Sequence, residues 1–107
     1  MPSNELPYHL LRQLTREPAA NQRSLAMQLG VSLGKVNFCL RALIDKGWVK
    51  ANNFRRSDNK SAYAYVLTPI GIEQKGRLTR LFLQRKLDEF ERLQQEIEAL
   101  RTEASQT

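Results

Sequence analysis

The sequence has 107 residues, of which 41% are hydrophobic, and it carries a net charge of +6 and a single cysteine. This length suits one domain, or one domain with an extension, and a single cysteine excludes an intrachain disulfide and fits a reducing compartment. No apolar run reaches the ~18 residues of a membrane span, and Pro2, Pro7 and the polar residues between them interrupt any signal-peptide core.

The positive charge is unevenly distributed along the chain. Residues 1–83 hold thirteen Lys and Arg against five Asp and Glu, whereas residues 84–107 hold four against six. The first part therefore carries +8 and the last part −2. A basic compact region favours an anionic partner such as a nucleic acid, although a generic basic surface is the alternative.

Two short helices are predicted in the N-terminal third. Residues 4–16 form the first, with Asn4 as its N-cap and Pro7 in its first turn. Asn21 begins the second helix, and Gly30 ends it because glycine adopts a positive φ without steric cost. The apolar positions expected to face the core are Tyr8, Leu10, Leu11 and Leu14 in the first helix and Leu25, Ala26 and Leu29 in the second.

A third helix is predicted over residues 32–46 after a turn through an apolar residue, Val31, that we expect to be buried. Ser32 is its expected N-cap, and Gly47 closes its C-terminus. Two short helices joined by a tight glycine-containing turn are typical of a helix-turn-helix motif. The residues expected to form the core-facing stripe of the third helix are Val36, Leu40, Leu43 and Ile44.

The opposite face of the third helix differs from an ordinary solvent-exposed face, which is filled with Glu, Lys and Gln. It carries Gly34, Asn37, Phe38, Arg41 and Asp45, with Lys35 at its edge. An amide can pair with adenine, a guanidinium with guanine, and an apolar group can touch a thymine methyl. A lysine near a helix N-terminus opposes the helix dipole, and a bound phosphate would remove that conflict. A surface helix with incidental residues is the alternative.

After the third helix the pattern changes from helical to alternating, which predicts a β-hairpin. The two strands are expected over residues 48–54 and 61–67. Arg55, Arg56 and Lys60 lie in the connecting turn, where they can reach phosphates or a minor groove. The alternative is a solvated turn, since Ser-Asp-Asn is ordinary turn chemistry.

A long helix is predicted from Thr68 and Pro69 to about residue 104, with the threonine as N-cap and the proline at the first helical position. Gly71 and Gly76 lower the helix propensity of the first turns, so the helix can bend there.

From residue 83 this helix has a heptad-like apolar pattern, which Lys86 interrupts once. The stretch is shorter than the three to four heptads that identify a coiled coil. Pairing with the same helix of a second chain would cover the stripe, and in a parallel pair Glu96 would lie near Arg101 of the partner subunit. Packing back onto its own domain is the alternative. The residues expected at the dimer interface are Leu83, Leu87, Phe90, Leu93, Ile97 and Leu100.

The sequence offers no metal-ligand spacing, no phosphate-binding glycine loop and no pair of nucleophile and base. We therefore expect no enzyme activity, no metal and no cofactor. His9, the only histidine, has no ligand-type neighbours in sequence and receives no chemical role. Cys39 lies beside the apolar stripe of the third helix, where a small buried thiol is a simpler interpretation than a redox sensor.

Four stretches resemble winged-helix transcription regulators of the MarR type, most of all the small branch associated with bacterial exopolysaccharide (EPS) biosynthesis. They are residues 21–26 (NQRSLA), 29–37 (LGVSLGKVN), 43–50 (LIDKGWVK) and 63–72 (YAYVLTPIGI). The resemblance implies a dimeric DNA-binding regulator in the bacterial cytoplasm, at the nucleoid, and it implies no particular effector. We find no counterpart of the additional N-terminal helix of larger members, so neither their mode of dimerisation nor their ligand crevice is carried over.

The predicted fold is mainly α with a small β-hairpin: a winged helix-turn-helix domain in residues 1–80, followed by a C-terminal dimerisation helix in residues 81–107. The favoured function is sequence-specific binding of double-stranded DNA by a homodimer that reads an inverted repeat and controls EPS genes. A protein–protein interaction module on the same fold is the alternative. The residues expected to contact DNA are Arg23, Ser32, Gly34, Lys35, Asn37, Phe38, Arg41, Arg55, Arg56 and Lys60.

Overall fold

The computed structural model describes residues 5–55 and 61–106, and it describes their side chains except at positions 53–55 and 61–63. Its elements are α1 (Leu6–Arg16), α2 (Gln22–Leu29), α3 (Leu33–Asp45), β1 (Val49–Arg55), β2 (Ser61–Leu67) and α4 (Pro69–Ser105). This order confirms the predicted winged helix-turn-helix with a long C-terminal helix. The chain divides into two units, Met1–Arg77 and Leu78–Thr107, which are described separately.

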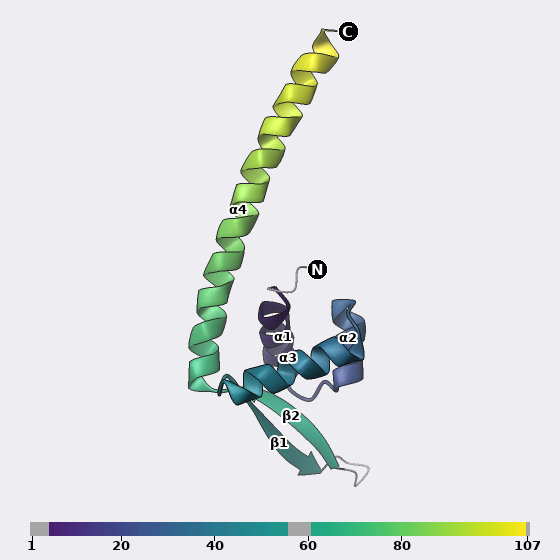
Figure 1. Cartoon of the computed structure of the whole chain (residues 1–107), viewed down its shortest axis with the longest axis vertical. Coiled ribbons are helices and arrows are strands. Elements are labelled where there is room, and N and C mark those ends of the chain that lie inside the picture. The colour runs from purple at the N-terminus through teal and green to yellow at the C-terminus, as the bar shows by residue number, and fades with distance from the viewer. Residues whose placement is uncertain (1–4, 56–60, 107) are drawn as a thin grey trace. The chain divides into compact units, whose positions relative to one another are not determined.

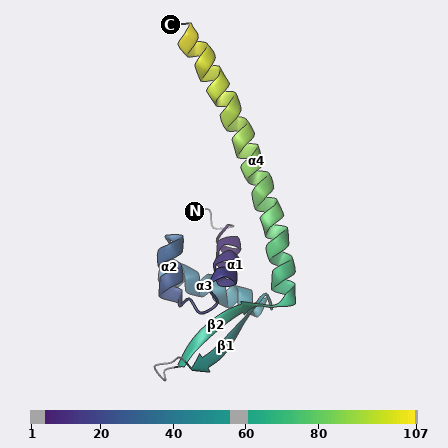
Figure 2. The same cartoon turned by 180° about the vertical axis from the view of Figure 1, so that it is seen from behind.

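The first unit is built around α1, which packs against α2, α3 and β2. Figures 1 and 2 show the three short helices grouped together, with the hairpin extending from them. The predicted core positions are largely confirmed, although Tyr8, Leu29, Val31 and Ile44 are only half-buried. The side chains with at most 2% exposure are Leu10, Leu11, Leu14, Leu25, Val36, Leu40, Leu43 and Val49.

The helix-turn-helix is defined by the caps that the sequence predicts. The Asn21 side chain accepts a hydrogen bond from the Ser24 N–H at 2.7 Å and so caps α2. Ser32 caps α3 in the same way, because its hydroxyl accepts from the Lys35 N–H at 3.1 Å. Gly30, with φ of +67°, ends α2 and turns the chain toward α3.

The predicted N-terminus of the first helix was wrong. Glu5 occupies the N-cap position of α1, whereas the predicted cap, Asn4, lies outside the described residues. Pro7 stands in the first turn as expected, where its missing N–H costs nothing because the first N–H groups of a helix have no intrahelical acceptor.

The two strands form an antiparallel hairpin in which Val49 pairs with Leu67 and Arg55 pairs with Ser61. Tyr65 in β2 is buried, and its backbone N–H donates to the Pro18 carbonyl at 3.0 Å. The hairpin is therefore bonded to the loop that connects α1 and α2, which fixes its base against the helices.

A compact junction joins the base of the hairpin to α4. The Thr68 N–H donates to the Trp48 carbonyl at 3.0 Å, and the Thr68 hydroxyl donates to the Gly47 carbonyl. The same hydroxyl accepts from the Gly71 N–H at 3.0 Å, which confirms Thr68 as the N-cap of α4. The helix is continuous through Gly71 and Gly76, so the glycines do not interrupt it.

Candidate nucleic-acid interface

The α3 helix has two faces of different character. Its buried stripe packs into the core through Val36, Leu40 and Leu43. On the other side, residues three, four and seven positions apart share one surface, as helical spacing requires. Gly34, Lys35, Phe38 and Arg41 are exposed, and Asn37 is half-buried at the edge of that surface. The structure therefore brings the predicted residues of α3 together on one accessible face.

The Phe38 ring is 78% exposed, which is unusual for a large apolar side chain. The nearest turn toward the N-terminus carries Gly34, whose added Cβ would meet only the Ser32 Oγ, at 4.0 Å. Because Gly34 has no side chain, a partner can approach the helix backbone closely there. Gly34, the ring of Phe38 and the guanidinium of Arg41 follow one another along this face. These are the groups that contact base edges and thymine methyls in a major groove.

Two cationic side chains and the free backbone N–H groups at the N-terminus of α3 lie beside this face. Lys35 and Arg23 are both exposed, on α3 and α2 respectively. Ser32 satisfies one of the first N–H groups of α3, and the remaining ones, together with the helix dipole, favour a negative group at this end. The arrangement suits a phosphate beside the N-terminus of α3.

The wing residues are only partly described. Arg55 is the last residue of β1, and its side chain is among those not described. Arg56 and Lys60 lie outside the described residues. The structure confirms the hairpin that carries them, and their contact with DNA remains a prediction.

One polar connection at this surface was not predicted from the sequence. The Asn37 Nδ2 donates to the Gln22 Oε1 at 3.1 Å, and the Gln22 Nε2 donates to the Tyr65 hydroxyl at 3.2 Å. The bonded residues lie 15 and 43 positions apart in the chain. No local sequence signal indicates such a contact, because it forms only when α2, α3 and β2 pack together.

The described residues contain no group of three or more His, Cys, Asp or Glu side chains that could hold a metal ion. His9 packs against Tyr8 with 5.2 Å between the ring centroids. Burial raises the pKa of the Cys39 thiol, and the charge of Lys46 opposes this only in part. Cys39 is therefore a protonated, weakly reactive thiol near neutral pH.

Within the described residues, no helix has both the length and the apolar character needed to cross a lipid bilayer.

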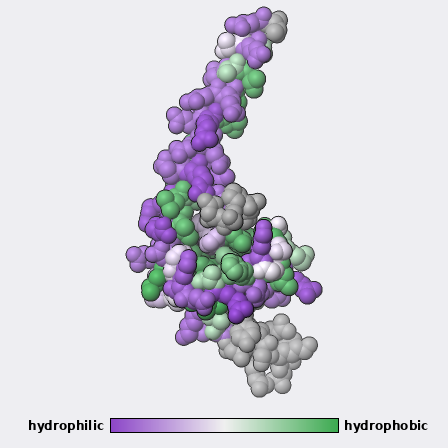
Figure 3. Space-filling view, viewed as in Figure 1, coloured by the Kyte–Doolittle hydropathy of each residue, from purple (hydrophilic) through white to green (hydrophobic). Residues whose placement is uncertain are grey.

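The second unit carries the predicted dimerisation face. Figure 3 shows apolar patches among the hydrophilic surface of α4. Lys86, which interrupts the stripe, is paired with Glu89 at 3.1 Å and lies 5.2 Å from the centroid of the Phe82 ring. The stripe residues are 39–62% exposed, and they are Leu83, Leu87, Phe90, Leu93, Ile97 and Leu100.

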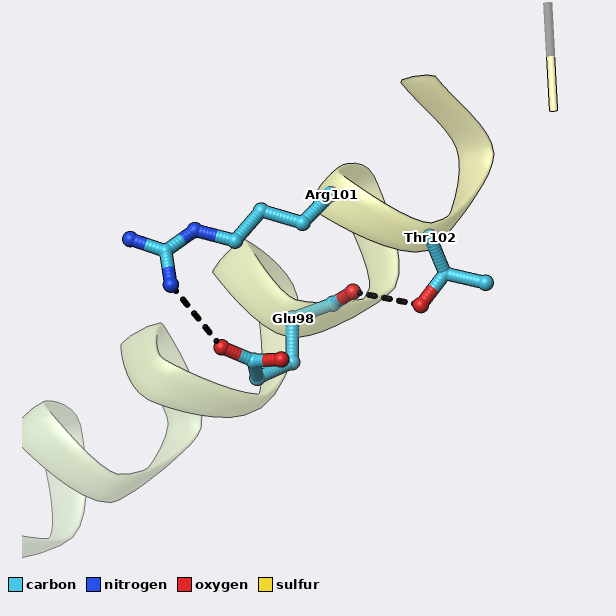
Figure 4. Close-up of polar contacts among 3 residues, drawn as sticks. All are labelled: Glu98, Arg101 and Thr102. Atoms are coloured by element: carbon cyan, nitrogen blue, oxygen red, sulfur yellow. Dashed lines mark hydrogen bonds and ion pairs between the residues drawn. The ribbon is translucent and has the colours of Figure 1, made fainter. Parts of the chain in front are cut away.

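Near the C-terminus of α4, the ion pair of Glu98 and Arg101 spans 3.2 Å on one side of the helix, and the Thr102 hydroxyl donates to the Glu98 carbonyl (Figure 4). Both charged side chains are at least 70% exposed, so solvent screens the pair and its contribution to stability is small. Phe90, Ile97 and Arg101 line a shallow hollow on this part of the helix.

These features define a winged helix-turn-helix domain with an accessible basic and apolar helix face, and comparison with known proteins agrees. The family model described as winged helix-turn-helix DNA-binding matches residues 3–50. No curated protein sequence matches the chain.

Solved structures of transcriptional regulators share the fold. A MarR transcriptional regulator from Methanosarcina mazei Go1 is 25% identical, with a TM-score of 0.64 over 78% of this chain and 59% of its own. A MarR/EmrR family regulator from Acinetobacter sp. ADP1 is 21% identical, with a TM-score of 0.63 over 95% and 76% of the two chains. A PadR-like regulator from Bacillus cereus is 16% identical, with a TM-score of 0.69 over 81% and 91%.

The chain thus spans 59% of the length of the Methanosarcina regulator. The likenesses below 25% identity establish the fold alone. The match of residues 3–50 to a winged helix-turn-helix DNA-binding family model is the finding that points to DNA.

Proposed function

We propose that this protein is a transcriptional regulator that binds double-stranded DNA sequence-specifically as a homodimer. In this proposal α3 enters the major groove, the hairpin contacts the backbone or the minor groove, and the two-fold symmetry of the dimer matches an inverted repeat. Half-sites would lie about 10 bp apart, or a multiple of that spacing.

The observation that carries the proposal is the outward face of α3. Phe38 is 78% exposed, Arg41 and Lys35 are exposed beside it, and Gly34 leaves room for close approach. This set combines base-reading and phosphate-binding groups on one helix, which is the division of roles in helix-turn-helix proteins. Arg23 and Ser32 are proposed to bind phosphates next to α3, and Arg55, Arg56 and Lys60 are proposed to do so from the hairpin.

Arg41→Ala tests the reading role. Loss of a guanidinium that pairs with a base is expected to cost about 1–3 kcal/mol and to relax the preference at one base pair. Arg55→Ala, which removes a proposed contact to the DNA backbone, is expected to weaken binding to all sequences alike. The measurement is fluorescence anisotropy with the preferred duplex and with single-base variants of it.

Arg92→Ala is the matched control, because Arg92 is an exposed arginine on α4 that belongs to the second unit and is not part of the helix-turn-helix motif. It removes the same charge and is expected to leave the base preference unchanged. An identical, uniform loss of affinity in the Arg41 and Arg55 variants would contradict the assigned roles.

The homodimer is proposed from the exposed stripe of α4. Leu83, Phe90 and Ile97 recur seven residues apart and are 55%, 58% and 39% exposed, and a stripe with this spacing is covered when a second copy packs its own stripe against it. The stretch after residue 83 carries a charge of −2 from its Arg, Lys, Asp and Glu residues, with both signs present, so two copies can approach without strong repulsion.

Phe90→Asp tests the interface. A charge placed in an apolar seam must be desolvated on pairing, so we expect this variant to sediment as a monomer in analytical ultracentrifugation. The unaltered protein is expected to show twice the chain mass of 12.4 kDa. Gln95→Asp adds the same charge at another exposed position of α4 and should remain dimeric. A dimeric Phe90→Asp variant would contradict this interface, and a monomeric unaltered protein would favour packing of α4 on its own domain.

Control of exopolysaccharide genes is proposed from the sequence resemblance described above. The test is to locate the selected binding sequence in the source genome. A position upstream of polysaccharide biosynthesis genes is expected, and an exclusive position elsewhere would contradict this assignment.

A protein–protein interaction module is the second candidate, since Phe38 and Met27 are 78% and 80% exposed and could contact another protein. Salt distinguishes the two functions. Contacts to ~6 or more phosphates weaken DNA binding by orders of magnitude between 50 and 200 mM salt, whereas apolar contacts to a protein respond weakly.

A further inference from the structure

The side chain of Asn37 is held by a hydrogen-bonded chain that crosses three elements. Its Nδ2 donates to the Gln22 Oε1 at 3.1 Å, and the Gln22 Nε2 donates to the Tyr65 hydroxyl at 3.2 Å. All three side chains are buried or half-buried. Hydrogen bonds in such a setting restrict side-chain rotation more than bonds in open water do.

Both supporting residues are themselves anchored. Gln22 is the first residue of α2, and the Asn21 cap fixes that helix end through a 2.7 Å bond to the Ser24 N–H. Tyr65 is 9% exposed, and its N–H donates to the Pro18 carbonyl at 3.0 Å. The chain of bonds therefore connects Asn37 to the part of the hairpin that is bonded to the loop between α1 and α2.

The bonding pattern leaves the Asn37 amide with a defined set of free groups. A primary amide has two N–H donors and one carbonyl acceptor, and the bond to Gln22 uses one N–H. In the part of the chain that the structure describes, the other N–H and the oxygen stay available, and these are the donor and acceptor that adenine requires for a paired contact. An amide held in one orientation loses less side-chain entropy on binding than a freely rotating one.

We propose that Gln22 is a positioning residue that orients the Asn37 amide for recognition of an adenine, with the Tyr65 hydroxyl as its anchor. The inference rests on the proposed function, because it assigns the origin of specificity at one base pair of the site. Gln22 acts through Asn37 and makes no base contact itself.

The test begins with the unaltered protein and Asn37→Ala, each used to select duplexes from a random library. The base pair whose preference disappears in Asn37→Ala is the one that Asn37 reads. Gln22→Met keeps the length and the apolar stem of the side chain but removes both hydrogen bonds. It is expected to lower discrimination at that same base pair about fivefold, the factor that one neutral hydrogen bond of ~1 kcal/mol represents, and to leave the other positions unchanged.

Two further variants separate positioning from a structural effect. Tyr65→Phe removes only the anchoring hydroxyl and should lower discrimination at the same base pair by a smaller factor. Gln28→Met is the matched control, because Gln28 also lies on α2 but bonds to Ser24 and Glu17 rather than to α3. It should discriminate as the unaltered protein does, and thermal unfolding verifies that all variants fold.

The coupling between the residues supplies the decisive comparison. The double variant Gln22→Met with Asn37→Ala should discriminate no worse than Asn37→Ala alone, since Gln22 acts only through that amide. If Gln22→Met changed the preference at a different base pair, or lowered the affinity for every sequence equally, the positioning role would be overturned. If the unaltered protein selects no sequence, the proposed function fails; if it does and Gln22→Met matches it, only this inference fails.

Discussion

Gly71 occupies a position where the structure leaves no space for a side chain. An ideal Cβ at this residue would lie 1.9 Å from the Trp48 carbonyl oxygen and 2.8 Å from its carbon. Both atoms belong to the backbone, so no flexible side chain can move aside. Gly71→Ala is therefore expected to destabilise the junction between β1 and α4, although alanine is the better helix former.

The magnitude follows from the contacts at this junction. Real Cβ atoms stay at least 3.0 Å from such neighbours, so the backbones must separate by about 1.1 Å. The shift acts on the Thr68 bonds to Trp48, Gly47 and Gly71, each worth about 1 kcal/mol. Loss of two or three of them, less about 1 kcal/mol of gained helix propensity, leaves a net cost of roughly 1–2 kcal/mol.

Thermal unfolding followed by circular dichroism measures this cost. For a domain of this size, 1–2 kcal/mol lowers the melting temperature by roughly 4–16 °C. Gly34→Ala is the matched control, since its Cβ would meet one atom at 4.0 Å. Equal melting temperatures of Gly71→Ala and the unaltered protein would refute the reasoning, as would an equally large loss in Gly34→Ala.

Two further predictions concern α3. Gly34→Ala should raise the free energy of unfolding by up to about 1 kcal/mol through helix propensity. In the proposed complex its added Cβ would stand between α3 and the DNA, so the same variant should bind duplex DNA more weakly. Unchanged affinity in a titration would contradict the role proposed for Gly34. Burial raises the pKa of Cys39 in the folded protein, so its stabilising contribution is complete below the unfolded thiol pKa of about 8.5 and is lost as the pH rises through the higher folded pKa. Urea unfolding between pH 7 and 10 should show a steeper alkaline loss of stability in the unaltered protein than in Cys39→Ala, and parallel curves would disprove it.

The element boundaries were largely predictable because they are set by residues next to them in sequence. Asn21 and Ser32 cap α2 and α3 as expected, and Gly30 and Gly47 have the positive φ values that favour glycine. The alternating pattern likewise predicted the hairpin and its two strands. These signals act over a few residues, so the sequence alone expresses them.

Features that depend on packing were missed. From the sequence, Gly71 was expected to allow a bend in the long helix. In the structure α4 is continuous there, and the missing side chain of Gly71 instead makes room for the backbone carbonyl of Trp48. Gln22 had no recognisable role until α2 and α3 were placed side by side, where it bonds to Asn37. The outward face of α3 was predictable from helical spacing, but the half-buried state of Asn37 was not, because a neighbouring helix produces it.

Selection of bound duplexes from a fully random library tests directly whether α3 reads base pairs. The proposed regulator should enrich one inverted repeat, and the same selection with Arg41→Ala should lose the preference at one symmetric pair of positions. Recovery of unenriched, random duplexes with the unaltered protein would contradict base reading by α3. The basic surface would then bind polyanions without sequence preference.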